Sequence, residues 1–257
     1  NSTSDPLEID VMRIDKSGGE VIMDANLLVD ETQDPLQFNN ATSFLDLNGF
    51  NLTLGKDGVV SAITYNGGAF RGTTNSSMTI EGNGTLGNGL VFDSNFNDLG
   101  DLTISRTSNG LVTLNSALNV ANDITIDEGT FELSAADNLN GNLVLNGGSF
   151  SSGASTGNAE TLNTLDVNST NSSIDLGTGS HTLTFANSSS VSWTAGTILT
   201  INNWSGDAGT SGSGTAGTIN VGSGGLSSTQ LDQIQFSGGY PTGAVLTSSG
   251  EVVPEFE

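Results

Sequence analysis

The sequence predicts an all-β protein, a single right-handed parallel β-helix, from a repeated phrase, its spacing and a composition suited to a thin core. The phrases are Asp101-Leu-Thr-Ile, Asp123-Ile-Thr-Ile and Asn142-Leu-Val-Leu, each entered from Asp or Asn. Their starts lie about 20 residues apart, within the range of stacked supersecondary units. The last two phrases continue through a Gly turn to Phe131 and Phe150. Such a repeat is typical of a solenoid, in which each circuit of the chain stacks on the previous one.

The composition suits a fold with little interior. Hydrophobic residues make up 34% of the 257 residues, and there are 35 glycines. Low hydrophobicity with high charge can indicate disorder, but here the apolar residues form regular short runs. A solenoid needs only one inward row per strand, with Asn, Gly, Ser and Thr at its corners. We therefore expect an ordered solenoid over most of the chain.

The charge of the chain argues against several classes of partner. Lys and Arg number 5 against 28 Asp and Glu, a formal net charge of −23. Nucleic-acid phosphates and anionic membranes attract clusters of Lys and Arg, which this sequence lacks. The absence of Cys excludes disulfides and thiolate metal sites. We expect no nucleic-acid partner, no membrane insertion, and an extracellular or bacterial cell-surface location.

Residues 1–35 are predicted to form an N-terminal cap or a pairing strand, and residues 36–257 the solenoid with an aromatic C-terminal cap. Leu7–Ile14 alternates apolar and polar residues, which is typical of a half-buried strand. Gly18-Gly19 marks a turn after it. Two interpretations stay open: this strand covers the first coil, as terminal repeats often do, or it pairs with a neighbouring subunit.

The repeats begin near Phe44 and continue to Phe236 in steps of roughly 16 to 23 residues. About ten coils, stacked at about 4.8 Å, would build a rod roughly 50 Å long. Asn48-Gly49 is also a strong hairpin signal, so a sandwich or prism of antiparallel hairpins is the alternative fold. Residues 153–158 and 206–217 are Gly- and Ser-rich, and we expect them to be loops within one domain.

One short helix is expected within the β fold, from Ser228 to Ile234. Ser228 is a candidate N-cap, and Leu231 and Ile234 would share one face. At under two turns, this helix would be a local element.

Two residue patterns resemble functional sites but have simpler explanations. Gly82-Asn-Gly84-Thr-Leu-Gly87 matches GxGxxG, but a dinucleotide fingerprint needs a helix to follow, and the next residues read as a strand. We therefore interpret these glycines as turn residues. His181 is the only histidine and precedes an apolar phrase without an evident catalytic partner, so we expect it in a turn.

Acidic residues could serve a glycan-cleaving site if two faced one cleft. A lyase would also need a Lys or Arg base, and none of the basic residues in the repeats has an obvious partner in the sequence. The acids are therefore expected to be solvated corners, and we predict no catalytic, cofactor-binding or metal-binding residues. The candidate acids are Asp93, Asp98, Asp101, Asp123, Asp127 and Glu128, and the candidate bases are Lys56, Arg71 and Arg106.

No resident cofactor is expected, although oxygen ligands are plentiful enough for weak surface Ca²⁺ binding. The nonapeptide of calcium-binding β-rolls and the EF-hand loop are both absent from the sequence. Asn-x-Ser/Thr acceptors are frequent in a chain this rich in Asn, Ser and Thr, and glycosylation depends on the host. Examples are Asn40, Asn51, Asn75, Asn168 and Asn187.

Three aromatic residues near the end of the chain have two interpretations. Trp193, Trp204 and Tyr240 would either plug the last coil, which otherwise exposes its core, or form a platform on which a glycan stacks. We favour the plug.

The chain from His181 to Pro254 resembles a known family. It is similar to the C-terminal part of bacterial secreted proteins with autotransporter-associated β-strand repeats, many of which carry a PEP-CTERM sorting tail. Val253-Pro254-Glu255 resembles the start of that tail, with Phe256 where Pro is expected. The resemblance implies an exported surface or matrix protein with a β-solenoid and implies no catalytic residues. The phrases that carry it are His181-Thr-Leu-Thr-Phe, Trp193-Thr-Ala-Gly-Thr-Ile-Leu-Thr-Ile-Asn-Asn-Trp204, Gly224-Gly-Leu-Ser-Ser-Thr-Gln-Leu-Asp-Gln-Ile-Gln-Phe236, Tyr240-Pro-Thr-Gly-Ala-Val-Leu and Gly250-Glu-Val-Val-Pro254.

The function expected from these observations is structural. The ends of a solenoid present unpaired backbone groups that template further strands, so we expect self-association into a filament, sheath or surface layer. A glycan-binding surface adhesin is the alternative, and a polysaccharide lyase or hydrolase is a third possibility. We expect the protein not to be an enzyme.

Overall fold

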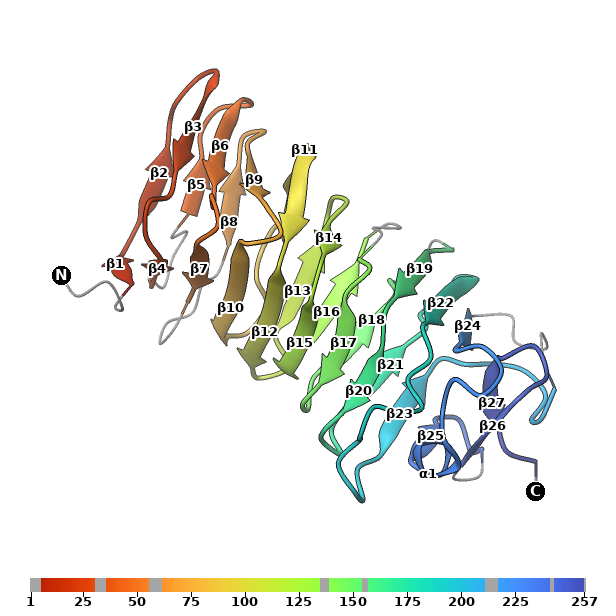
Figure 1. The fold of residues 1–257 in the computed structure, drawn as a ribbon. Helices are drawn as coiled ribbons and strands as arrows, with labels where there is room; N and C mark the ends of the chain where they lie inside the picture. Colours follow the sequence, from red (N-terminus) through yellow and green to blue (C-terminus); the bar gives the residue numbers. More distant parts are fainter. Residues whose placement is uncertain are drawn as a thin grey trace. The chain divides into compact units, whose positions relative to one another are not determined.

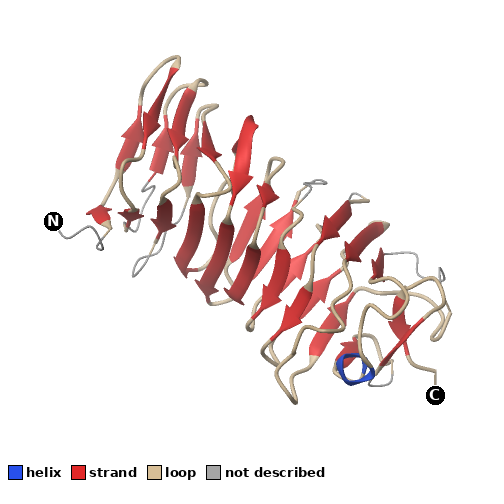
Figure 2. Cartoon of the chain, viewed as in Figure 1, coloured by secondary structure: helices blue, strands red, loops and turns tan. Residues whose placement is uncertain are grey.

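The computed structural model describes residues 6–30, 36–55, 62–134, 139–153, 157–210, 217–240 and 243–256. These residues form short strands, turns and one helix of a single turn (Figures 1 and 2). Strands from successive coils pair in parallel, which confirms the predicted all-β fold, a parallel β-solenoid. Internal contacts divide the chain into two units, Asn1–Phe131 and Glu132–Glu257.

In the first unit, each coil supplies strands to three parallel sheets. Isolated bridges at Ala62–Gly87 and Leu90–Leu114 continue the second sheet towards β13 (Leu111–Leu114). The first sheet holds β1 (Leu7–Ile9), β4 (Leu27–Val29), β7 (Asn51–Leu54), β10 (Ser77–Asn83), β12 (Asp101–Thr107) and β15 (Asp123–Glu128); the second holds β2 (Met12–Ile14), β5 (Leu36–Phe38) and β8 (Ile63–Tyr65); the third holds β3 (Gly19–Ile22), β6 (Ser43–Asp46), β9 (Ala69–Gly72), β11 (Phe92–Leu99) and β14 (Asn119–Val120).

The register of the first sheet sets the length of a coil. Leu27 lies opposite Leu52, Leu52 opposite Met78, Met78 opposite Leu102, and Leu102 opposite Ile124. The intervals of 22 to 26 residues between these partners exceed most of the predicted steps. The predicted step was too short because every apolar phrase was counted as a new coil, whereas a coil with three sides contains more than one such phrase.

The core is built from the inward row of each strand. Side chains alternate between the two faces of a strand, so the apolar residues of the repeated phrases point inward and the residues between them outward. Met78, Leu102 and Ile124 are buried, whereas Thr103 and Thr125 pair in register on the outer face. Each added coil therefore extends one apolar row and one polar row.

An aromatic cluster of the first unit consists of Phe38, Tyr65, Phe70 and Phe92. Phe38 stacks on Tyr65 with ring centroids 5.2 Å apart and meets Phe70 edge-on at 5.3 Å. Phe92 packs on Phe70 at 5.7 Å. The Tyr65 hydroxyl donates to the Gly89 carbonyl at 3.2 Å, so the buried phenol is satisfied.

The second unit repeats the parallel arrangement and ends in an antiparallel pair, β26 (Ala244–Leu246) with β27 (Val252–Pro254). Strand β16 (Thr130–Leu133) crosses the boundary between the units. The parallel sets of the second unit are β17 (Asn142–Leu145) with β20 (Leu165–Val167); β18 (Ser149–Ser151), β21 (Ser173–Asp175), β23 (Leu199–Asn202) and β25 (Ile234–Phe236); and β19 (Ala159–Leu162), β22 (His181–Phe185) and β24 (Gly217–Asn220).

The hairpin suggested by Asn48-Gly49 does not form. Asn48 and Gly49 both have positive φ, 48° and 85°, and turn the chain between β6 and β7. These two strands lie in different sheets and each pairs in parallel with strands of other coils. The turn is therefore a corner of the coil, because ladder partners from neighbouring coils replace the local antiparallel partner.

The predicted single strand Leu7–Ile14 is instead two strands. β1 ends at Ile9 and β2 begins at Met12, and they belong to different sheets. The alternation of apolar and polar residues continues across the corner, which explains why the sequence reads as one strand.

The helix α1 (Ser228–Leu231) is shorter than predicted, because Ile234 already belongs to β25. Its N-cap is Ser227 rather than Ser228. The Ser227 hydroxyl accepts from the Gln230 N–H, and the Gln230 side chain accepts from the Ser227 N–H at 2.7 Å. This reciprocal capping box satisfies two backbone donors that the first turn leaves open.

Candidate functional site

The glycine motif surrounds a buried arginine. Arg106 continues the inward row of β12 and is fully buried. Its Nε donates to the Gly84 carbonyl at 2.7 Å, its Nη1 to Glu81 at 2.6 Å and its Nη2 to Asn83 at 2.7 Å. No helix follows the motif within the described residues 82–99, and the next strand is β11. The motif therefore spans the end of β10 and the bend that follows it, and carbonyls of this segment bind a guanidinium.

Arg71 has partners that the sequence did not indicate. Its guanidinium binds Glu20 at 2.7 Å and Asp93 at 2.6 Å. It also lies over the Phe44 ring at 3.7 Å and the Phe96 ring at 4.9 Å. These residues come from four adjacent strands of the third sheet, so the contacts fasten successive coils together on the outer face. The expectation that Arg71 lacks a partner is wrong.

Three of the acids expected at solvated corners lie instead along two strands. Asp93 and Asp98 lie in β11 and Asp101 begins β12. Partial burial alone would raise the pKa of Asp93, but hydrogen bonds from the Asn95 backbone and from Arg71 hold it below its usual value. Asp98 accepts from the Asn119 side chain at 2.7 Å.

The remaining candidate acids form no group suited to a metal. Asp123, Asp127 and Glu128 all lie in β15. Within the described ranges, no set of three or more His, Asp or Glu side chains is placed to hold a metal ion. The candidate base Lys56 lies outside the described residues.

His181 is a buried strand residue, not the turn residue predicted. It begins β22 and shares the inward row with Leu183 and Phe185. Its Nδ1 accepts from the Asn158 N–H at 3.0 Å, which places the proton of the neutral ring on Nε2. Burial lowers the pKa of His181, and the negative charge of Asp175 opposes this shift in part.

We expect His181 to make the protein less stable in mild acid. Because its pKa is lower in the folded state, the unfolded chain takes up the proton first, near its ordinary pKa of about 6.5. Stability present above this pH is therefore lost as the pH falls towards the folded pKa. Denaturant titrations over this range should show the loss, and His181→Gln should flatten it, because no other histidine titrates there. An unchanged slope in the variant would contradict this.

The two tryptophans are buried, so neither indole can form the glycan platform that was the alternative to the plug. Trp193 Nε1 donates to the Leu165 carbonyl at 3.0 Å. Trp204 packs edge-on against Phe236 and Tyr240, with centroids 5.4 and 5.1 Å away. The aromatic residues act in packing, although their role as a plug stays a prediction.

The Asn residues of the glycosylation motifs mainly make contacts between coils or within turns. Asn40 donates to Asp15 at 2.8 Å, and Asn168 donates to Asn146 at 3.1 Å. The other three lie at a strand start, a turn and an exposed loop, namely Asn51, Asn75 and Asn187.

The last strands of the second unit have occupied outer edges. At β20, the Leu165 N–H donates to the Ser188 hydroxyl at 2.9 Å and the Leu165 carbonyl accepts from Trp193. At β24, Asn220 forms an antiparallel bridge with Glu251. These partners come from non-strand segments or from antiparallel chain, so they do not continue the parallel ladder.

The outer edge of β25 is also bound by another segment of the chain. The Ile234 carbonyl accepts from the Gly243 N–H at 2.9 Å. Together with β20 and β24, this leaves each of the three parallel sets of the second unit with a blocked last strand.

The first coil of the first unit has open edges instead. The Leu7 N–H donates to Asn26 and the Ile9 carbonyl accepts from Asp30, so both residues face β4. Alternate residues of a strand direct their backbone groups to opposite sides, so the Glu8 N–H and carbonyl face away. Among the described residues, no partner reaches the Glu8 backbone.

The second strand of this coil is open in the same way. The Ile14 carbonyl accepts from the Asn39 N–H, so the backbone groups of Arg13 face away from β5. No described residue binds them. At β3, the Lys16 amine donates to the outward Glu20 carbonyl at 3.3 Å, whereas no described residue binds the outward backbone groups of Ile22. β3 is therefore open in part, and β1 and β2 are the two strands of this coil on which every outward backbone group is open.

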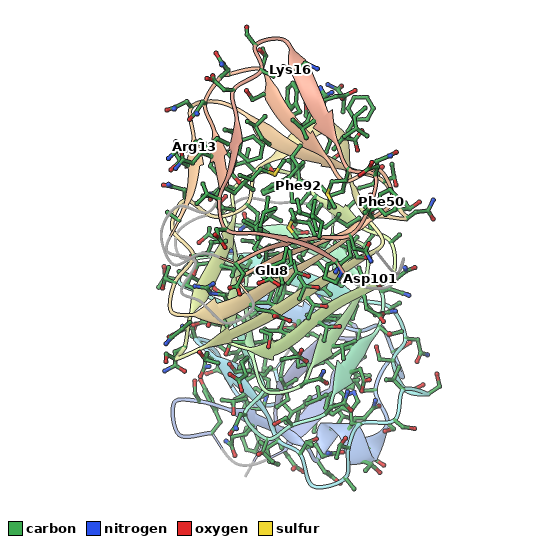
Figure 3. The ribbon with its side chains drawn as sticks, turned by 90° about the vertical axis from the view of Figure 1, so that its left-hand side faces the viewer. Glu8, Arg13, Lys16, Phe50, Phe92 and Asp101 are labelled. Carbon is green, nitrogen blue, oxygen red and sulfur yellow. The ribbon has the colours of Figure 1, made fainter. Side chains whose placement is uncertain are left out.

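The first coil also concentrates exposed apolar side chains. Of five large hydrophobic residues exposed in the described chain, three lie here: Leu7 at 56%, Val11 at 42% and Ile22 at 54%. Figure 3 shows this end of the first unit, with Glu8 and Arg13 labelled on the two open strands. Apolar groups beside unpaired backbone groups are typical of a strand-pairing surface.

Comparisons with protein-family models, with curated protein sequences and with solved structures found no match for this chain. The described helix is also far too short and polar to cross a membrane. The class of protein is therefore defined by the fold, an acidic parallel β-solenoid, and its candidate functional site is the open first coil.

Proposed function

We propose that the protein is a non-catalytic structural protein of the bacterial cell exterior that self-associates through its first coil. The observation that carries the proposal is the pair of open edges at β1 and β2. Unpaired strand edges beside exposed apolar residues accept further strands. The first coil supplies one contact, and growth into a filament, sheath or surface layer would need a second contact elsewhere on the chain.

The positions of the basic groups support a structural role. Catalysis by a glycan lyase would require a base free to reach its substrate, but Arg71 is held by two carboxylates and Arg106 by three backbone carbonyls. His181 is buried beneath the surface of the second unit. These groups contribute to the solenoid instead.

The composition supports the location. A chain with net charge −23 and no Cys suits a soluble extracellular material, and the repeated polar corners need no disulfide. The resemblance of residues 181–254 to secreted repeat proteins points in the same direction.

Light scattering over a broad range of protein concentrations tests the proposal. We expect the mean particle mass to rise with concentration, and electron microscopy of the concentrated sample to show assemblies of uniform width. A monomer at every concentration, in both the presence and the absence of Ca²⁺, would contradict self-association.

A second candidate function is glycan binding by the outer face of the third sheet. Phe96 is 50% exposed and lies beside Arg71 and Phe44, and aromatic rings next to charged groups suit sugar stacking. Binding to a glycan array that Phe96→Ala abolishes and Thr103→Ala retains would favour the adhesin. Equal binding by both variants would exclude this face.

A further inference from the structure

We propose that a second copy of this chain docks on the first coil, with β1 of each copy antiparallel to β2 of the other around a twofold axis. The twofold axis passes through the corner of the chain between Asp10 and Val11. In this arrangement Glu8 lies opposite Arg13 of the partner subunit. The inference rests on the proposed self-association and names its surface and geometry.

The backbone groups fit this register. In antiparallel pairs, facing residues alternate between those that exchange both hydrogen bonds and those that exchange none. Glu8 and Arg13 are the central residues of β1 and β2 whose N–H and carbonyl groups face away from the next coil. Placing them opposite each other makes them a hydrogen-bonded pair, whereas a shift by one residue would leave these groups unmatched.

The side chains fit the same register. Counting outward from the corner, Ile9 meets Met12 of the partner subunit and Leu7 meets Ile14 of the partner subunit. Leu7 and Ile9 pair with the inward residues Leu27 and Val29 of the next coil, so these apolar contacts would extend the core across the twofold axis. The exposed Leu7 would become covered.

The outward side chains are complementary in charge. Glu8 and Arg13 are both exposed and neither has an ion-pair partner among the described residues. The twofold axis creates two Glu8–Arg13 pairs per dimer. Arg13 and Lys16 are two of only five cations in the chain, so the first coil is one of the few surfaces that can offer positive charge to an acidic second copy.

The last strands of the second unit do not offer an equivalent surface. A copy that added in parallel to β20, β24 or β25 would first have to displace Trp193, Glu251 or Gly243. Closed twofold symmetry uses the same patch on both copies and needs no second site. The expected particle is therefore a discrete dimer, which forms before any larger assembly.

Charge reversal tests the geometry by sedimentation velocity over a dilution series. Arg13→Glu and Glu8→Arg each place like charges opposite each other twice, and we expect each to weaken dimerisation by at least about 100-fold. The double variant Glu8→Arg with Arg13→Glu restores opposite charges and should dimerise as the native chain does. Thr64→Glu, on the outer face of β8 in the same sheet as Arg13, is the matched control and should not change the dimer.

The results for these variants distinguish an error in the interface from an error in the proposed self-association. Rescue by the double variant supports the register. Self-association that no charge reversal weakens would overturn this interface but leave the proposed function standing. A native chain that stays monomeric would overturn both, and the charges of the first coil would then serve to protect an edge from pairing. Circular dichroism of each variant checks that the solenoid is intact.

Discussion

Replacing Arg106 by Leu will lower the free energy of unfolding by about 3–5 kcal/mol, a cost typical of disrupting a buried charged network. The reason is that the buried Arg106 side chain is lost and the carbonyls of Glu81, Asn83 and Gly84, at a partly exposed end of β10, lose their donor. An acceptor left without a donor costs about 1–3 kcal/mol where it is buried, and less where water can replace the donor. Denaturant-induced unfolding, followed by circular dichroism, measures the change.

Two further variants separate the role of the guanidinium from that of charge. Arg106→Lys keeps the charge but cannot bind three divergent carbonyls, so we expect most of the loss to remain. Arg71→Leu removes a partly exposed arginine and should cost only about 1 kcal/mol. Equal stability of Arg106→Leu and the native chain would show that the turn does not depend on this side chain.

Replacing Phe70 by Ala will lower the free energy of unfolding by about 3–5 kcal/mol. Phe70 is fully buried and contacts the rings of Phe38, Tyr65 and Phe92. The truncation removes apolar burial and leaves a cavity, because the neighbouring coils hold the surrounding rings in place. The measurement is again the denaturant midpoint.

Phe96→Ala is the matched control, since this phenylalanine belongs to the next strand of the same sheet and is 50% exposed. We expect its loss of stability to stay below about 1 kcal/mol. Similar losses for the two variants would contradict the assignment of the aromatic cluster to the core.

The repeating part of the fold was predictable from the sequence, because a parallel ladder imposes one inward apolar row at each coil. Leu102 and Ile124 follow this rule and are buried in register. The number of sheets was not predictable, since an apolar phrase does not specify the side of the coil to which it belongs. The corner at Asn48-Gly49 shows the same limit: the local turn signal is real, but the strands find their partners in other coils.

The burial of two polar residues was not predicted, although the alternation of side chains along their strands indicates it. Arg106 follows Leu102 and Ile104 at intervals of two, and His181 precedes Leu183 and Phe185 in the same way. Residue type suggested exposure in both cases, but the inward direction of the strand decided the outcome. Their hydrogen-bond partners lie in other coils and could not be read from the local sequence.

The first coil as a candidate site was only partly visible in the sequence. The strand-forming pattern of residues 7–14 indicated either a cover or a pairing element. The directions of the backbone groups of Glu8 and Arg13 required the structure, because they depend on which residues bond to β4 and β5.

Amide hydrogen exchange at Glu8 and Arg13, measured over a range of protein concentrations, detects pairing through the first coil without any substitution. Both amides should exchange quickly in dilute solution and become protected as the dimer forms, while the Leu7 amide, already bonded to Asn26, should change less. Fast exchange at Glu8 and Arg13 in a sample that has demonstrably self-associated would contradict pairing through the first coil.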